Sequence, residues 1–146
     1  MRMSWLEIDS PTLKHHHLSW VGLRGLSLLP GMATYKNFTE IVPTNFSASL
    51  ILPADNSSPV WGHVGNVLEG HLPQCRPGLR VEAMPSESWR ASVLSPILKV
   101  AATRQPDCRR GQFGQNKVRF ERLLLPFADT LRVRVVHIIY DIPGYA

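Results

Sequence analysis

The sequence predicts an α+β fold in which an antiparallel sheet of about five strands is flanked by helices. Two observations lead to this class. The last thirty residues alternate between apolar and polar side chains, as two adjacent strands do. The residues after Pro85 instead repeat apolar side chains at steps of three and four, as one face of a helix does. A chain of 146 residues is long enough to hold one domain with a single core.

The beginning of the chain indicates a short helical arm, residues 1–33, before the main domain, residues 34–146. His15, His16 and His17 are consecutive, and three adjacent side chains cannot all face one metal ion from a regular element. We therefore expect them in a solvated or frayed terminus. Weak helical spacing from Leu18 to Leu29 predicts a short helix that ends at Pro30.

The middle of the chain predicts a first hairpin followed by helices. Phe46 to Leu52 and Val60 to Asn66 predict two short strands, because the residues between them are turn formers. A short helical piece is expected over 67–71, and the clearest helix follows Pro85, with Ser86 as its N-cap. Its apolar residues share one face that should lie across the sheet; they are Trp89, Val93, Leu94, Ile97, Leu98 and Ala101.

Two further features follow within and after this helix. Pro96 lacks the backbone N–H that a helix interior needs, so we expect a kink or a brief break there. Residues 104–116 are polar and contain two glycines. They predict an irregular connection into the final hairpin.

The final hairpin is expected to consist of strands over 117–127 and 131–142. We interpret one parity of each strand as a single, mostly apolar face that carries a histidine; its residues are Val118, Phe120 and Leu124, and Val133, Val135, His137 and Ile139. The opposite parity also becomes apolar toward the strand ends, at Leu123, Leu125 and Phe127, and at Val136, Ile138 and Tyr140. Both faces of the sheet should therefore be covered by a helix, a partner subunit or a ligand.

Two segments carry a resemblance to a known family. Val60 to Asn66, with the sequence VWGHVGN, resembles the second strand of a PAS domain as it runs into the small helices. Val118 to Asp129, with the sequence VRFERLLLPFAD, resembles the penultimate strand of a stand-alone bacterial PAS-like family. The order of the predicted elements is also that of a PAS domain. The resemblance covers roughly residues 34 to 142 and implies a cytoplasmic sensory or protein-interaction domain without an attached output domain.

The resemblance also implies that the sheet and its helices can enclose a ligand. The residues that could line a shared interior are Trp61, His63, Leu94, Leu98, Phe120, Leu124, Val135 and His137. The alternative is that these side chains simply fill the core, since small domains rarely leave interior volume empty. The identity of any cofactor stays open.

His137 has several interpretations. A lone histidine on an apolar strand face is usually buried and satisfied by one hydrogen bond. It could instead anchor a ligand, act as a pH-sensitive switch or bind haem. No metal cluster and no catalytic residue is predicted.

Two other function classes are weighed against the regulatory one. An enzyme would need a catalytic pair, but the α-carbons of His137 and Asp141 should lie about 13 Å apart on one strand, and no nucleophile or phosphate-loop motif accompanies them. A weak nucleic-acid binder would interleave basic and aromatic side chains, but Arg119 and Phe120 should point apart. The excess of 16 Lys and Arg over 11 Asp and Glu is mild, so the charge does not favour nucleic acid as a partner.

The expected partners are a small-molecule ligand and either a protein or a second copy of the chain. A homodimer would use the N-terminal arm and the outer face of the sheet, because that face is apolar. No apolar run reaches the roughly eighteen residues of a membrane span. Arg24 interrupts the one stretch that could suggest a secretory signal, so we expect a cytoplasmic protein.

Overall fold

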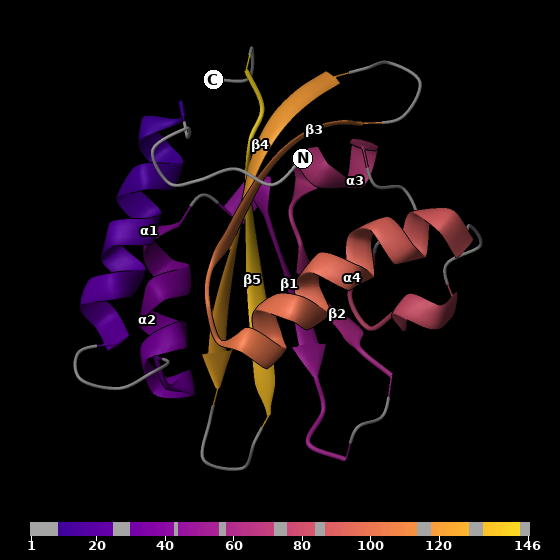
Figure 1. The fold of residues 1–146 in the computed structure, drawn as a ribbon, viewed down its shortest axis with the longest axis horizontal. Coiled ribbons are helices and arrows are strands. Elements are labelled where there is room, and N and C mark those ends of the chain that lie inside the picture. The colour runs from indigo at the N-terminus through magenta and orange to yellow at the C-terminus, as the bar shows by residue number, and fades with distance from the viewer. Residues whose placement is uncertain are drawn as a thin grey trace.

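The computed structural model describes residues 9–24, 30–42, 44–55, 58–71, 76–83, 87–113, 118–128 and 133–143. These residues form a five-stranded antiparallel sheet with the order β2-β1-β5-β4-β3, and helices flank it (Figure 1). The strands are β1 Ser47–Leu52, β2 Val60–Val64, β3 Asp107–Phe113, β4 Val118–Ala128 and β5 Arg134–Asp141. The helices are α1 Pro11–Arg24, α2 Met32–Ile41, α3 Asn66–His71 and α4 Glu87–Thr103, with short 3-10 turns at Thr44–Phe46 and Val81–Ala83. The predicted α+β class is confirmed.

The sheet carries a hydrophobic cluster on each face. The cluster on the α4 side includes Leu50, Trp61, Ile97, Leu124 and Ile138. The cluster under α1 and α2 includes Leu13, Trp20, Phe38, Leu125 and Phe127. The expectation that both faces of the sheet are covered is therefore confirmed, and helices of the same chain provide the cover (Figure 1). The apolar parity from which a dimer was predicted is divided between the two faces. Leu123, Leu125 and Phe127 lie under α1 and α2, whereas the cluster on the α4 side contains Val136, Ile138 and Tyr140.

The register of the final hairpin corrects the predicted faces. Leu124 pairs with Ile138, and Leu125 pairs with His137. Val118, Phe120 and Leu124 thus lie on the α4 side, whereas Val135 and His137 lie on the side of α1 and α2. The prediction that placed them on one face was wrong by one residue of register, and such a slip moves every side chain of a strand to the other face.

The first helix also differs from its prediction. α1 begins at Pro11, behind Ser10, whose Oγ accepts a hydrogen bond of 3.1 Å from the backbone N–H of Leu13. This is an N-cap followed by proline at the first helical position. His16 is buried within α1, so the prediction of a frayed histidine terminus was wrong. Residues 25–29 of the expected helix lie outside the described part of the chain.

Two elements were not predicted. α2 has its buried residues Phe38 and half-buried Tyr35 three positions apart, and the predicted boundary between residues 33 and 34 falls inside it. β3 occupies part of the segment that was expected to be an irregular connection, and it pairs with β4 along its whole length, from Asp107 with Leu124 to Phe113 with Val118. Pairing with a long neighbouring strand satisfies its backbone groups despite its polar sequence.

The central predictions hold. β1, β2, α3, α4 and the two strands of the final hairpin all lie where they were expected, with ends shifted by a few residues. α4 runs without interruption through Pro96, so the predicted break is absent. Ser86 and the side chains of Trp89 and Val93 lie outside the described residues. Among the described helices, none has the length and apolar character needed to cross a membrane.

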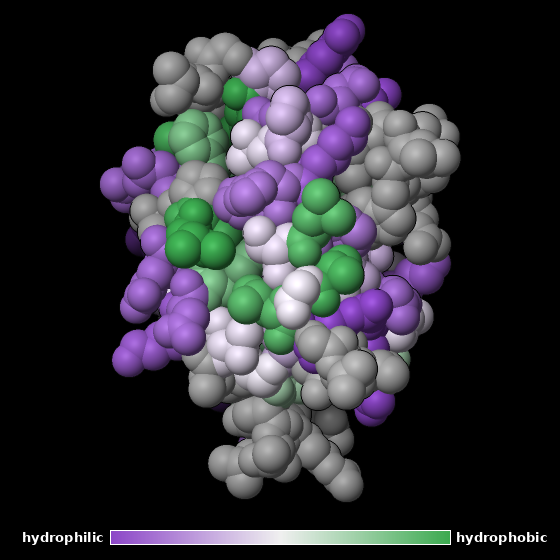
Figure 2. Space-filling view, turned by 90° about the vertical axis from the view of Figure 1, so that its left-hand side faces the viewer, coloured by the Kyte–Doolittle hydropathy of each residue, from purple (hydrophilic) through white to green (hydrophobic). Residues whose placement is uncertain are grey.

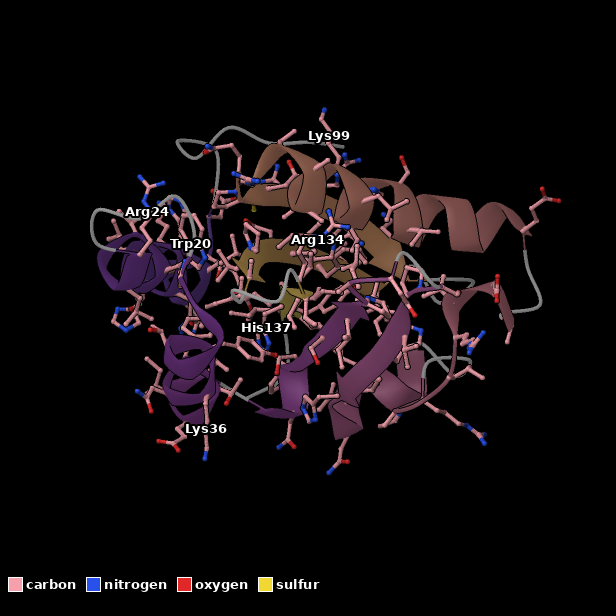
Figure 3. All side chains as sticks on the ribbon, turned by 90° about the horizontal axis from the view of Figure 1, so that it is seen from below. Trp20, Arg24, Lys36, Lys99, Arg134 and His137 are labelled. Carbon is pink, nitrogen blue, oxygen red and sulfur yellow. The ribbon has the colours of Figure 1, made fainter. Side chains whose placement is uncertain are left out.

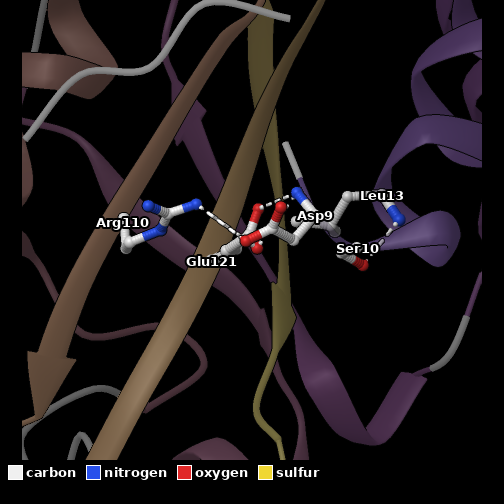
Figure 4. A network of polar contacts seen from close by, with 5 residues as sticks. All are labelled: Asp9, Ser10, Leu13, Arg110 and Glu121. Carbon is white, nitrogen blue, oxygen red and sulfur yellow. Dashed lines mark hydrogen bonds and ion pairs between the residues drawn. The ribbon is translucent and has the colours of Figure 1, made fainter. Parts of the chain in front are cut away.

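The start of α1 is tied to the strands by a polar network at the sheet edge (Figure 4). The backbone N–H of Asp9 donates to the Glu121 carboxylate at 3.2 Å, and Arg110 Nη2 donates to Asp9 Oδ2 at 3.1 Å. Because Arg110 and Asp9 are exposed, this ion pair contributes little stability in water. The network fixes where α1 begins relative to β3 and β4.

Candidate functional site

The sheet divides the residues that were predicted to line one interior. Trp61, Phe120 and Leu124 belong to the α4 side, where half-buried Leu94 packs against them. Val135 and His137 belong to the opposite side, opposite Phe127 and Leu125. His63 is exposed, and Leu98 is 42% exposed on the outside of α4. The eight residues therefore do not form one shared pocket, because the register of β4 against β5 separates them.

Trp61 is the central residue of the α4 side. Both backbone groups of Trp61 are hydrogen-bonded. The N–H donates to the carbonyl of Leu79 at 3.0 Å, and the carbonyl accepts from the N–H of Gly78 at 2.7 Å. Gly78 has a φ of 83°, a conformation in which glycine is favoured. This turn fixes the indole inside the cluster that also contains Leu50 and Val81.

The indole nitrogen of Trp61 is a buried donor with no acceptor. Nε1 finds no hydrogen-bond partner among the residues that the structure describes, although the side chain is almost completely buried. An indole N–H can only donate, and a buried donor left unsatisfied costs about 1–3 kcal/mol. Native proteins keep few such groups, and each requires an explanation such as a bound water or ligand.

Charged side chains lie at the β3 end of the same face. Arg109 Nε donates to Asp107 Oδ2 at 2.8 Å, and the Asp107 carboxylate is largely buried. Arg122, which pairs with Arg109 across the strands, is also buried, and its Nε finds no partner within the described chain. In the sequence, Arg122 is a charged residue between Phe120 and Leu124 on the apolar face of the predicted strand. Its burial beside Asp107 was not anticipated.

His137 is the central residue of the other side, between the strands and α2 (Figure 3). Its Nδ1 lies 3.0 Å from the hydroxyl oxygen of Tyr35, a residue of α2. The rings of Tyr35 and Phe38 each meet the imidazole edge to face at 5.6 Å. The Nε2 of His137 finds no partner in the described part of the chain.

Burial keeps both members of this contact neutral. Desolvation lowers the pKa of His137 to about 3, and the neighbouring His63 and His16 add to the decrease. Desolvation raises the pKa of Tyr35, although a hydrogen bond with Ser49 acts in the opposite direction. The geometry agrees in part with the interpretation of His137 as a buried histidine satisfied by one hydrogen bond, because Nδ1 has a partner in Tyr35 whereas Nε2 has none among the described residues. Among the described residues no three His, Cys, Asp or Glu side chains gather in a way that could hold a metal ion.

Trp20 fastens α1 to the same side of the sheet. Its Nε1 donates a buried hydrogen bond of 2.9 Å to the carbonyl of Pro126 in β4, and the Arg24 guanidinium lies over its ring at 5.3 Å (Figure 3). Leu13, His16 and Trp20 share the buried face of α1. Their spacing of three and four residues is the signal from which this helix could have been found in the sequence.

Comparison with known proteins finds no family model, no curated protein and no solved structure that matches this chain.

Proposed function

We propose that this chain is a PAS-like regulatory domain that binds a small molecule in the core on the α4 side of the sheet. The proposal is supported by the order of the elements and by the strand sequences VWGHVGN and VRFERLLLPFAD, which resemble those of PAS domains. The observation that carries it is the unsatisfied indole N–H of Trp61, which is buried among apolar side chains.

The surroundings of Trp61 define the class of ligand. The indole requires one hydrogen-bond acceptor, a carbonyl or ether oxygen or an aromatic nitrogen. The cluster that contains Trp61 consists of hydrophobic side chains, among them Leu50, Val64 and Leu68, so a charged ligand would lose its hydration without compensation. The ligand is therefore a largely apolar, uncharged molecule with an acceptor at one end.

Native mass spectrometry of freshly purified protein tests the proposal. The native mass is compared with the denatured mass, and an absorbance scan is taken of the same sample. We expect an extra mass in the wild type that is lost or strongly reduced in Trp61→Phe, because phenylalanine keeps an aromatic ring but lacks the donor. Trp20→Phe is the matched control, since it makes the same change on the opposite face and should retain the extra mass.

The stability of the same two variants gives a second readout. Trp20→Phe leaves the buried Pro126 carbonyl without its donor and should cost about 1–3 kcal/mol. Trp61→Phe in ligand-free protein removes a group that has no partner, so it should cost less. A clean apo mass in wild-type protein, together with equal losses of stability in both variants, would refute the ligand proposal.

A further inference from the structure

The outer face of the helical layer exposes apolar side chains. Leu18 is 68% exposed and Val21 is 37% exposed on α1, and Ile41 is 60% exposed on α2. We call these three residues the outer patch. The buried side of α1 is formed by Leu13, His16 and Trp20, so Leu18 and Val21 turn away from the sheet.

Figure 2 views the molecule from the side of α1 and α2. Hydrophobic side chains gather at the centre of this face, and hydrophilic ones lie above them and on both sides. An apolar centre with a polar rim is the usual anatomy of a protein interaction surface.

The charges on this face are mostly positive. α1 contains Lys14 and Arg24 and no Asp or Glu, and α2 contains Lys36 and the single acid Glu40. Lys14 and Lys36 are exposed, and Figure 3 shows Lys36 pointing away from the molecule. Cations on the rim favour a partner that brings carboxylates.

We infer that the outer patch binds an acidic amphipathic helix of a partner protein. The apolar stripe of such a helix would cover Leu18, Val21 and Ile41, and its flanking carboxylates would face Lys14 and Lys36. This inference rests on the proposed regulatory function, because it supplies a protein partner on which a regulatory domain could act.

Two other occupants fit the surface less well. A second copy of the chain would bring the same excess of positive charge to the interface, since α1 and α2 together carry three Lys or Arg and one Glu, and like charges oppose association. Helices that bind an anionic bilayer insert Trp, Phe or Leu side chains, but Trp20 is buried and its indole N–H is bonded to the Pro126 carbonyl, so this ring does not face outward. The exposed apolar residues of the patch are aliphatic.

Binding is tested with two fluorescein-labelled helical peptides of about eighteen residues, read by fluorescence anisotropy. Both carry leucines at steps of three and four; glutamates flank the leucines in one peptide and lysines in the other. We expect the acidic peptide to bind the wild type at least about tenfold more tightly than the basic one, with an affinity that falls as salt is added.

Two pairs of variants locate the binding site. Leu18→Ser/Ile41→Ser should weaken the acidic peptide about tenfold or more, whereas Leu98→Ser, at an exposed leucine of α4, should not change its affinity. Lys14→Glu/Lys36→Glu should reverse the preference between the two peptides, whereas Lys99→Glu on α4 should leave it intact. Circular dichroism confirms that each variant is folded.

Four results would overturn the inference. They are no binding of the acidic peptide, equal affinity for both peptides, a wild-type dimer in light scattering that Leu18→Ser dissociates, and sedimentation with phosphatidylglycerol vesicles that Leu18→Ser abolishes. The last two would assign the patch to a second copy and to a membrane, respectively. Trp61→Phe separates this inference from the ligand proposal, because it should lose the bound mass and still bind the acidic peptide.

Discussion

The buried imidazole of His137 makes the stability of the fold sensitive to acid. Its pKa is lowered to about 3 in the folded protein, against 6.5 for an ordinary histidine. Below pH 6.5 the unfolded chain therefore binds a proton that the folded chain does not. The stability is complete above pH 6.5 and decreases as the pH falls toward 3.

The size of the effect follows from this difference. One pH unit corresponds to about 1.4 kcal/mol for a group protonated in only one state. At pH 4.5 the unfolded state is favoured by about 3 kcal/mol more than at pH 7.5 because of His137 alone. Since a domain is typically stable by about 5–15 kcal/mol, this is a large share of the total.

Urea unfolding at pH 7.5 and pH 4.5 measures the effect when the wild type is compared with Tyr35→Phe/His137→Leu. The double variant removes both partners of the 3.0 Å contact and so leaves no orphaned polar group at that contact. His16 and His17, whose pKa values are also lowered by burial, remain in both proteins. On acidification the free energy of unfolding of the double variant should decrease by about 3 kcal/mol less than that of the wild type. An equal loss in both proteins would show that the folded state protonates His137 readily, and the reasoning would fail.

Three further changes have defined outcomes. Ser10→Ala removes the N-cap of α1 and should lower the free energy of unfolding in urea by about 1 kcal/mol, whereas Ser10→Gly should cost only a few tenths; equal costs would contradict the capping role. Gly111→Ala places a methyl group 2.8 Å from the ring of Phe120 and should destabilise by about 1–3 kcal/mol in the same assay, and an unchanged midpoint would show that the ring moves aside. Burial raises the pKa of Cys108 to about 12, so in a Cys75→Ser background its thiol should react with a disulfide reagent only after unfolding; rapid reaction of the native protein would contradict this.

Much of the fold was predictable because its elements carry local signals. The turn formers between β1 and β2 and the apolar face of α4 are visible in the sequence. The face that each strand presents was not predictable, because it depends on the length of the loop between β4 and β5. Ala128 pairs with Arg134, and this pair sets the register of the two strands. A register shifted by one residue, with a loop longer or shorter by one, would have placed His137 on the α4 side.

The elements that the sequence did not reveal depend on tertiary contacts. β3 is polar, and its strand conformation comes from pairing with β4 rather than from its own propensity. Trp61 was correctly selected as a buried residue, but its unsatisfied donor depends on which acceptors surround it in space. The contact between His137 and Tyr35 joins β5 to a helix that was not predicted, and no sequence pattern relates residues so far apart.

The position of β1 between β2 and β5 has a consequence for biosynthesis. Residue 47 pairs with residue 139, so the two halves of the sheet meet only through strands from opposite ends of the chain. A nascent polypeptide that lacks β5 holds β1 and β2 as an isolated hairpin, which is marginally stable in water. Such distant pairing slows folding and leaves apolar strands exposed in the meantime. The complete sheet can therefore form only when β5 has left the ribosome, and until then its apolar strands are open to aggregation.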